Sequence, residues 1–224
     1  MTSTKGRFMD ILVIGGSRGI GLETVKAGLA AGHGMRAFAR SASKIGITDP
    51  NLQTIDGDAL DEGTLVEAMK GCDAVVQTIG LPVNRDTVFS PVDFASRATA
   101  TMIAAMETAG LRRLITVTGF GAGRSREAMS ALERLGHGAV LGRIYDDKTR
   151  QEQVIMESAL DWTIVRPVIL TNGKAKERYA ILMTPDEWRN GLISRADVAD
   201  FLIKAAGDDA YIRTDPVLSS ALAR

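Results

Sequence analysis

The sequence predicts an α/β fold, in which a doubly wound, mostly parallel sheet carries helices on both faces. Short apolar runs of about five residues alternate along the chain with longer segments whose apolar residues recur at helical spacing. Most of the short runs do not alternate between apolar and polar residues, which indicates strands buried on both faces. A glycine-rich segment follows the first apolar run directly. Together these observations favour parallel strands joined by crossover helices.

The expected elements follow one another in this alternating order. The expected strands are Asp10–Ile14, Met35–Ala39, Leu52–Ile55, Ala74–Thr78, Arg113–Val117 and Trp162–Val165. Helices fill the gaps, with apolar stripes that begin at Leu22, Ala95 and Val198. Towards the end of the chain we expect a strand at Tyr179–Met183, a helix at Arg195–Ala206 and a last strand near Asp215–Ser219. The segment Gly119–Gly142 is glycine-rich and is expected to form a long loop or a short inserted helix.

Length and composition favour one domain over residues 1–224 and argue against several kinds of partner. The 224 residues are 45% hydrophobic, enough for a full core. Lys+Arg and Asp+Glu both number 27, and no basic stripe suits a nucleic-acid backbone. One cysteine, Cys72, and two histidines offer neither an intrachain disulfide nor a structural zinc site, so we expect no metal. Without a long apolar run, a cytoplasmic protein that binds no membrane is expected, as a monomer or a homodimer.

The glycine-rich segment predicts an anion-binding turn. Glycines stand where the first strand turns sharply into the N-terminus of a helix, so backbone N–H groups there can approach a diphosphate. In a chain that keeps alternating between strands and helices, the expected ligand is a dinucleotide, and a mere tight turn is the alternative. The residues expected to bind it here are Gly15, Ser17, Arg18, Gly19, Ile20 and Gly21.

The end of the second expected strand favours NADP (NADPH) over NAD. An acidic side chain at this position would accept a hydrogen bond from a free ribose 2′-hydroxyl, whereas an arginine pairs with a 2′-phosphate. The residue here is Arg40, Arg18 points to the same neighbourhood, and no Asp or Glu stands between Glu23 and Asp49. Solvated surface arginines are the alternative for both positions.

These segments and those downstream resemble the short-chain dehydrogenase/reductase superfamily, specifically its atypical NAD(P)H-binding branch, which includes flavin/biliverdin reductase-like and NmrA-like proteins. The likeness covers nearly the whole chain. It rests on Gly15–Gly21, Ala39-Arg40, Gly57-Asp58, Asp73–Val76 leading to Gly80, Asp147-Lys148 with Glu152, Asp161–Pro167 and Ile193–Ala199.

The resemblance implies a Rossmann-type sheet with its ligand across the carboxyl ends of the strands. It also implies that Asp58 meets the adenine amino group, that the loop ending at Gly80 borders the adenosine, and that Pro167 shapes the wall beside the nicotinamide. Ala59, beside Asp58, and Thr78, at the end of the fourth expected strand, complete the expected cofactor-binding residues.

The chain departs from the Ser/Tyr/Lys set that typical members of the superfamily use for catalysis. Lys148 stands at the lysine position, where a long helix is expected to begin, but Tyr145 lies three residues before it rather than four. Tyr145 could still approach the site as a proton donor, or pack at the helix start with its hydroxyl at the surface. Lys148 is expected to hold the nicotinamide ribose, with an exposed lysine paired with Glu152 as the alternative.

The chain also departs from the superfamily at the position of the serine of the Ser/Tyr/Lys set. Thr118 is the one hydroxyl that follows the fifth expected strand, and it could bind a substrate carbonyl, a nicotinamide amide or local backbone groups. If no side chain supplies the proton, water must do so, which favours a flavin or a quinone as hydride acceptor. His137 is a second candidate donor, whereas His33 and Cys72 are expected to be structural.

The substrate pocket is expected to be formed by loops 81–90, 120–144 and 168–192, the last of which contains Trp188. Trp188 could stack on a planar acceptor or cover the core. The first functional hypothesis is an NADPH-dependent reductase of a small planar acceptor: a flavin, a quinone or a related carbonyl. The second is a non-catalytic NADP-binding sensor of the NmrA-like type, which the incomplete Ser/Tyr/Lys set favours. An epimerase or dehydratase with tightly held NAD is a third, weakened by Arg40.

Overall fold

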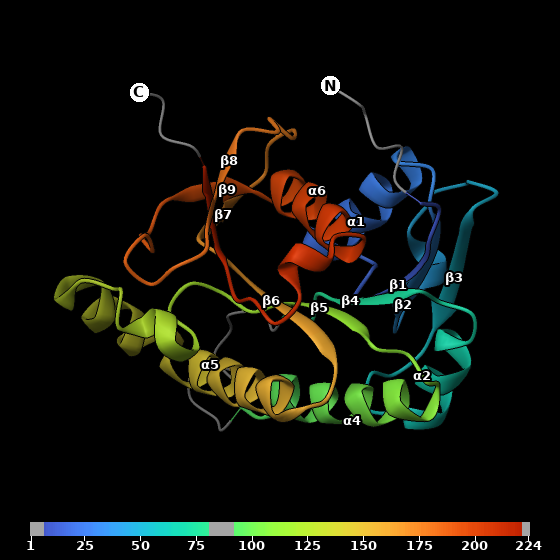
Figure 1. The fold of residues 1–224 in the computed structure, drawn as a ribbon, viewed down its shortest axis with the longest axis horizontal. Helices are drawn as coiled ribbons and strands as arrows, with labels where there is room; N and C mark the ends of the chain where they lie inside the picture. The colour runs from blue at the N-terminus through green and yellow to red at the C-terminus, as the bar shows by residue number, and fades with distance from the viewer. Residues whose placement is uncertain (1–6, 81–91, 221–224) are drawn as a thin grey trace.

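The computed structural model describes residues 7–80 and 92–220 and confirms the α/β class (Figure 1). The strands are β1 (Asp10–Ile14), β2 (Gly34–Ala39), β3 (Leu52–Asp56), β4 (Ala74–Gln77), β5 (Arg113–Val117), β6 (Asp161–Pro167), β7 (Ile169–Thr171), β8 (Tyr179–Leu182), β9 (Leu192–Ser194) and β10 (Val217–Ser220). The α-helices are α1 (Gly19–Ala30), α2 (Glu62–Met69), α4 (Phe94–Thr108), α5 (Ala131–Glu157) and α6 (Arg195–Ala206). Strands and helices therefore alternate as the sequence predicts.

Within the described residues, eight strands form one sheet in the order β3-β2-β1-β4-β5-β6-β10-β8. Its neighbouring strands pair in parallel, except β10 and β8, which pair antiparallel. A second sheet contains β7 and β9, also in parallel. The strand order reverses at β1, between β2 and β4. In doubly wound sheets of this kind, ligands bind at the carboxyl ends of the strands where the order reverses.

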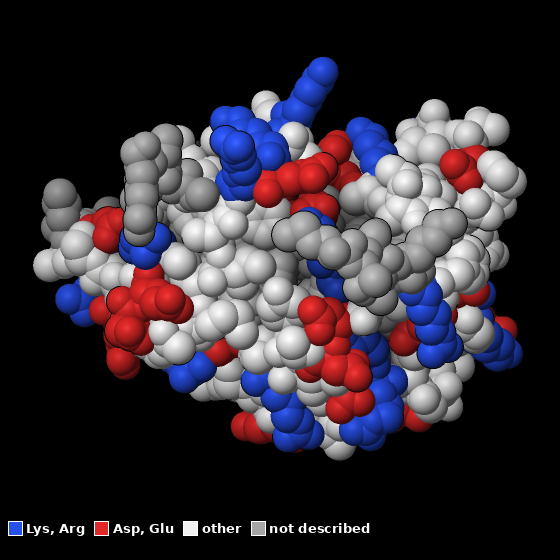
Figure 2. Space-filling view, turned by 45° about the horizontal axis from the view of Figure 1, so that its top comes forward, with Lys and Arg blue, Asp and Glu red and all other residues white. Residues whose placement is uncertain are grey.

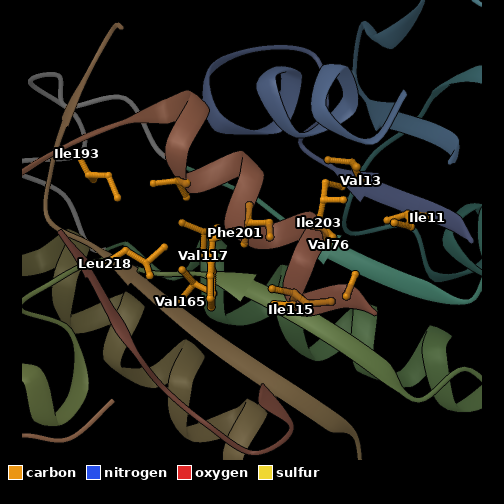
Figure 3. Close-up of a cluster of buried hydrophobic side chains, with 14 of the residues drawn as sticks. Ile11, Val13, Val76, Ile115, Val117, Val165, Ile193, Phe201, Ile203 and Leu218 are labelled. Carbon is orange, nitrogen blue, oxygen red and sulfur yellow. The ribbon is translucent and has the colours of Figure 1, made fainter. Parts of the chain in front are cut away.

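Helices cover both faces of the large sheet. Figure 1 shows α1 and α6 on one face and α2, α4 and α5 on the other. Ile11 and Val13 of β1 belong to the apolar cluster on the α6 side, together with Phe201 of α6 (Figure 3). Leu12 and Ile14 belong to the cluster on the opposite side. Because consecutive residues of β1 serve opposite cores, the strand reads as an unbroken apolar run.

The long helix α5 corrects one prediction. The segment 120–144 is not a loop throughout, because its second half, from Ala131 onward, is helical. The helix begins at a capping box: the Ser130 hydroxyl accepts from the Glu133 N–H at 3.3 Å, and the Glu133 carboxylate accepts from the Ser130 N–H at 2.8 Å. Glycines at 136, 138 and 142 lower the helix propensity of this segment, so the sequence does not predict that it is helical.

Charged side chains of both signs are interspersed on the face that Figure 2 shows. This mixture agrees with the formal net charge of zero. In the part of the chain that the structure describes, no helix combines the length and apolar composition needed to cross a bilayer.

Candidate functional site

A pocket of about 610 Å³ opens at the carboxyl ends of the strands on either side of the reversal, beside the start of α1. This volume lies in the usual range of small-molecule sites. Most of the residues that the sequence predicts at the cofactor line it: Gly15, Ser17, Arg18, Gly19, Ile20, Arg40, Asp58, Ala59, Thr78 and Gly80. Gly21, Lys148 and Pro167 are absent from this described wall. The structure thus brings the predicted adenosine and diphosphate contacts together in one pocket.

The turn between β1 and α1 needs its glycines for two different reasons. Gly15 and Gly19 have φ values of 87° and 57°, in the left-handed region that side chains disfavour. Gly21 is required for close packing, because a Cβ atom there would overlap the carbonyl oxygen of Gly15. The hydroxyl of Thr78 donates to the carbonyl oxygen of Ile14 at 3.1 Å, which ties the end of β4 to this turn.

The start of α1 is arranged to receive an anion. Arg18 is the N-cap residue, but its side chain forms no capping hydrogen bond, and the first turn contains no acidic residue. The first N–H groups of a helix have no acceptor within the helix, and the helix dipole adds partial positive charge there. The structure offers these N–H groups at the pocket, so the turn suits a phosphate or diphosphate.

The charged side chains that line the described pocket are Arg18, Arg40, Arg195 and Asp58. The side chains of Arg18 and Arg40 are exposed and form no ion pair or hydrogen bond within residues 7–80 and 92–220. Asp58 accepts from the Leu60 N–H at 3.0 Å through one carboxylate oxygen. The excess of positive charge matches a ligand with several phosphate groups.

Part of the wall could not be predicted from the sequence: Phe38, Ser41, Phe94 and Arg195 also line the pocket. Leu170 lines it too, and it belongs to the segment 168–192 that the sequence predicts as a wall of the substrate pocket. Arg195 comes from the far end of the chain, and the packing of α6 on α1 brings it here. The segment Ile193–Ala199 is one of the motifs that carry the family resemblance, but the spacing of its residues does not show that Arg195 reaches the pocket.

Lys148 is buried behind the pocket wall. Its ammonium group donates to the carbonyl oxygens of Ile79 at 2.8 Å and Val117 at 3.3 Å, and to Gln151 Oε1 at 3.0 Å. Burial lowers the pKa of Lys148 to about 8. The alternative of an exposed lysine paired with Glu152 is wrong, and Lys148 lies well inside α5 rather than at its start. Its three donor positions are occupied by acceptors of the chain itself.

Thr118 belongs to a buried network of charged groups. Its hydroxyl donates to Glu152 Oε1 at 2.7 Å. Glu152 also accepts two hydrogen bonds from the Arg166 guanidinium, at 3.0 and 2.7 Å, and Arg166 donates to the Asp215 carboxylate at 2.7 Å. Because the Thr118 hydroxyl already donates its hydrogen bond to Glu152, it can serve a ligand only as an acceptor in the present arrangement.

Tyr145 lies within α5 and not at its start, and it is partly buried. Its hydroxyl lies so near Gly119 that a Cβ atom at Gly119 would be 2.8 Å from it. Burial raises the pKa of Tyr145, so the phenol holds its proton more firmly than in water. Tyr145 and Thr118 are not among the residues that line the described pocket. The catalytic roles of Thr118, Tyr145 and Lys148 stay predictions.

The remaining predicted residues are structural or undescribed. Trp188 is buried, its ring N–H donates to the Leu182 carbonyl oxygen at 3.0 Å, and its ring faces Arg124 and Arg166 at 5.3 and 5.1 Å, so it covers the core. His33 is buried, and its Nδ1 accepts from the Met9 N–H at 3.3 Å. Burial raises the pKa of Cys72 to about 11, which keeps its thiol protonated. The side chain of His137 and the loop 81–90 lie outside the described residues.

A family model described as NAD(P)H-binding matches residues 15–209. An NAD(P)H azoreductase from Xenophilus azovorans is 27% identical over 202 residues, which are 87% of this chain and 62% of that protein. The photosystem II assembly factor Ycf39 from Synechocystis is 23% identical and is matched over 63% of its length. The chain thus spans less than two thirds of the length of these curated relatives.

Solved structures show the same fold. ChuY, an anaerobillin reductase from Escherichia coli O157:H7, superposes with a TM-score of 0.76 at 25% identity, over 96% of this chain and 98% of ChuY. A short-chain dehydrogenase/reductase from Veillonella parvula, solved in complex with NADP, has a TM-score of 0.80 at 19% identity, over 96% of each chain. The second likeness supports the fold alone, and both agree with the Rossmann-type sheet predicted from the sequence.

Proposed function

The chain belongs to the NAD(P)H-binding family, and from that premise we propose that it is an NADPH-dependent reductase of a small planar acceptor, such as a flavin, a quinone or a related carbonyl. One observation carries the proposal: the start of α1 and the unpaired Arg18 and Arg40 share one pocket at the reversal of the strand order. This combination suits a dinucleotide that carries an additional phosphate on its ribose.

Different residues of the pocket would bind different parts of the cofactor. The N–H groups at the start of α1 hold the diphosphate, and Arg40 with Arg18 pairs with the 2′-phosphate. Asp58 retains one carboxylate oxygen that accepts no hydrogen bond from the described residues, and this oxygen receives the adenine amino group. NADH offers no charge to Arg40, so its affinity is lower.

The chemical step depends on alignment more than on acid catalysis. When bound, the nicotinamide cofactor supplies a hydride to the acceptor. Lys148 holds the carbonyl groups of Ile79 and Val117 in place behind the pocket, and the Thr118 hydroxyl donates its hydrogen bond to Glu152. With these donors engaged, the proton for the product comes from water. A flavin or a quinone accepts a proton from solvent readily, so close alignment of donor and acceptor provides most of the rate.

The names of the relatives support an acceptor with a conjugated system. One is an NAD(P)H azoreductase and another an anaerobillin reductase. Azo compounds are conjugated, and their reduction adds a hydride and a proton across the N=N bond, with no alkoxide to be protonated. The same argument extends to flavins and quinones.

A second candidate is a non-catalytic NADP-binding sensor. It is favoured by the internal hydrogen bonds of Lys148 and Thr118, because groups already satisfied by the chain need not contact a substrate. In such a protein, the bound cofactor alters contacts with a partner and no acceptor is reduced.

Steady-state oxidation of NADPH, followed by its absorbance, separates the two candidates. The panel contains FMN, a soluble benzoquinone, an azo dye and, as a control that demands protonation of an alkoxide, an aliphatic ketone. The reductase is expected to oxidise NADPH with at least one conjugated acceptor and to leave the ketone unreduced. Tight binding of NADPH without turnover of any acceptor would instead favour the sensor.

A further inference from the structure

Arg195 is a pocket residue that neither the sequence prediction nor the proposed function uses. It is the first residue of α6, and it lines the cofactor pocket together with Gly19, the first residue of α1. The two helices pack against each other on the same face of the sheet (Figure 1). Gly19 and Arg195 also both line a neighbouring hollow of about 860 Å³, so they lie where the two cavities meet.

No carboxylate of the described residues forms an ion pair with Arg195, although Glu23, Glu177 and Asp200 line the neighbouring hollow with it. Its guanidinium donates to the side-chain oxygen of Asn172 at 2.6 Å, and it forms no ion pair within the described parts of the chain. An amide orients a guanidinium without neutralising it, since the amide carries no net charge. Arg195 therefore retains a full positive charge beside the start of α1.

The carboxylate nearest to Arg195 in sequence, that of Asp197, forms hydrogen bonds with other groups. Asp197, in the first turn of α6, accepts from the Ser194 hydroxyl at 2.6 Å and from the N–H groups of Lys176 and Glu177 at 2.7 and 3.0 Å. Ser194 in turn caps α6 by accepting from the Asp197 N–H at 2.9 Å. The start of α6 is thus closed by its own side chains, whereas the start of α1 has no side-chain cap. What α6 offers to the pocket is the side chain of Arg195.

We propose that Arg195 contacts the diphosphate of the bound cofactor beside the start of α1, with Asn172 as the residue that positions its guanidinium. This inference rests on the proposed function, because it takes the diphosphate to lie at the N-terminus of α1. A guanidinium and helix N–H groups at one diphosphate would share its two negative charges. Arg195 then contributes equally to NADPH and NADH, whereas Arg40 distinguishes them.

The test compares Arg195→Gln with Arg40→Gln by titration with NADPH, NADH and adenosine 2′-monophosphate, which lacks the diphosphate. Arg195→Gln is expected to weaken NADPH and NADH by a similar factor of about ten and to leave the 2′-monophosphate unchanged. Arg40→Gln is expected to weaken NADPH and the 2′-monophosphate and to leave NADH unchanged. Arg195→Lys, which keeps the charge, should recover part of the affinity, and Asn172→Ala should lose several-fold.

Three results would overturn the inference. The first is unchanged NADH affinity in Arg195→Gln. The second is an equal loss for the 2′-monophosphate, which would indicate a general disturbance of the pocket. The third is a higher KM for the acceptor at unchanged NADPH affinity, which would place Arg195 at the acceptor instead. Failure of the proposed function differs from all three, because the wild-type protein would then bind neither NADPH nor NADH.

Discussion

Arg40, just after β2, and Arg166, near the end of β6, both stand at the carboxyl ends of parallel strands of one sheet, yet their surroundings are opposite. Arg40, just after β2, is exposed and forms no hydrogen bond with the described residues. Arg166, near the end of β6, is fully buried and donates to Glu152 and Asp215. Around Arg40 the chain leaves cationic groups without partners, and around Arg166 it satisfies them internally.

This difference distinguishes side chains that are available to a ligand from side chains that stabilise the folded protein. Donors without protein partners at an open pocket are available to a ligand, and removing them costs the folded chain little. Donors buried with their acceptors stabilise the wall, and removing one leaves a buried charge uncompensated. The pocket that Arg18 and Arg40 line is of the first kind, and the hydrogen-bonded groups around Lys148, Thr118 and Arg166 are of the second.

The largest expected effect is on the buried network. Arg166→Leu leaves Glu152 and Asp215 buried without their shared partner, and it should lower the free energy of unfolding by about 3–5 kcal/mol. Urea denaturation measures this loss. Arg112→Leu is the matched control, since Arg112 forms an exposed ion pair with Asp161, and it should cost less than about 1 kcal/mol. Similar losses in the two variants would contradict the distinction.

Lys148→Met should lower the free energy of unfolding by about 2 kcal/mol near neutral pH, because three acceptors lose their donor. The pH dependence has a definite sign. The pKa of Lys148 is about 8 in the folded protein against an ordinary value of 10.5, so between these values the unfolded chain binds more protons. Stability of the wild type should therefore rise with pH across this window.

Denaturation of wild type and Lys148→Met at several pH values between 7 and 10 isolates this contribution, because other titrating groups cancel in the difference. The wild type should gain stability relative to the variant as the pH rises. A difference that stays constant would mean that Lys148 is solvated rather than buried.

Replacing Arg18 and Arg40 together by Gln should weaken NADPH by about a hundredfold or more and NADH by much less, since each charge-assisted hydrogen bond contributes about 1.5–3 kcal/mol. Stability should change by less than about 0.5 kcal/mol, because both side chains are exposed. Calorimetric titration and urea denaturation of the same variant measure both quantities. Equal losses for the two cofactors would refute the assignment of the arginines.

The smallest effect is expected at Tyr145. Tyr145→Phe keeps the ring that packs against Gly119 and removes the hydroxyl, and reductase turnover should change by less than about twofold if water supplies the proton. Steady-state turnover against the best acceptor measures it. A loss of about a hundredfold or more would instead identify Tyr145 as the proton donor.

The fold and the pocket at the start of α1 could be predicted, because the sequence patterns that indicate them are local. Unbroken apolar runs identified β1 and β5 to the residue, the helical stripe identified α6, and the glycine turn with Arg40 indicated the residues that meet in one pocket. In each case, a single segment of sequence contains the whole physical reason for the structure.

The surroundings of Lys148, Glu152 and Arg195 could not be predicted, because they are formed by segments that lie far apart in the sequence. The sequence predicts that Lys148 holds the nicotinamide ribose, with an exposed lysine paired with Glu152 as the alternative. It could not show that the carbonyl oxygens of Ile79 and Val117 accept hydrogen bonds from the buried ammonium group, or that Glu152 pairs with Arg166 of β6. Arg195 reaches the pocket only through the packing of α6 on α1. Helical glycines hid the first half of α5, although the capping box at Ser130 and Glu133 was visible in the sequence.

Titration of the wild-type protein with NADPH and NADH, followed by calorimetry, tests the central claim most directly. We expect NADPH to bind with a dissociation constant in the micromolar range and at least about ten times more tightly than NADH. If neither nucleotide binds at millimolar concentration, the pocket at the start of α1 is not a dinucleotide site.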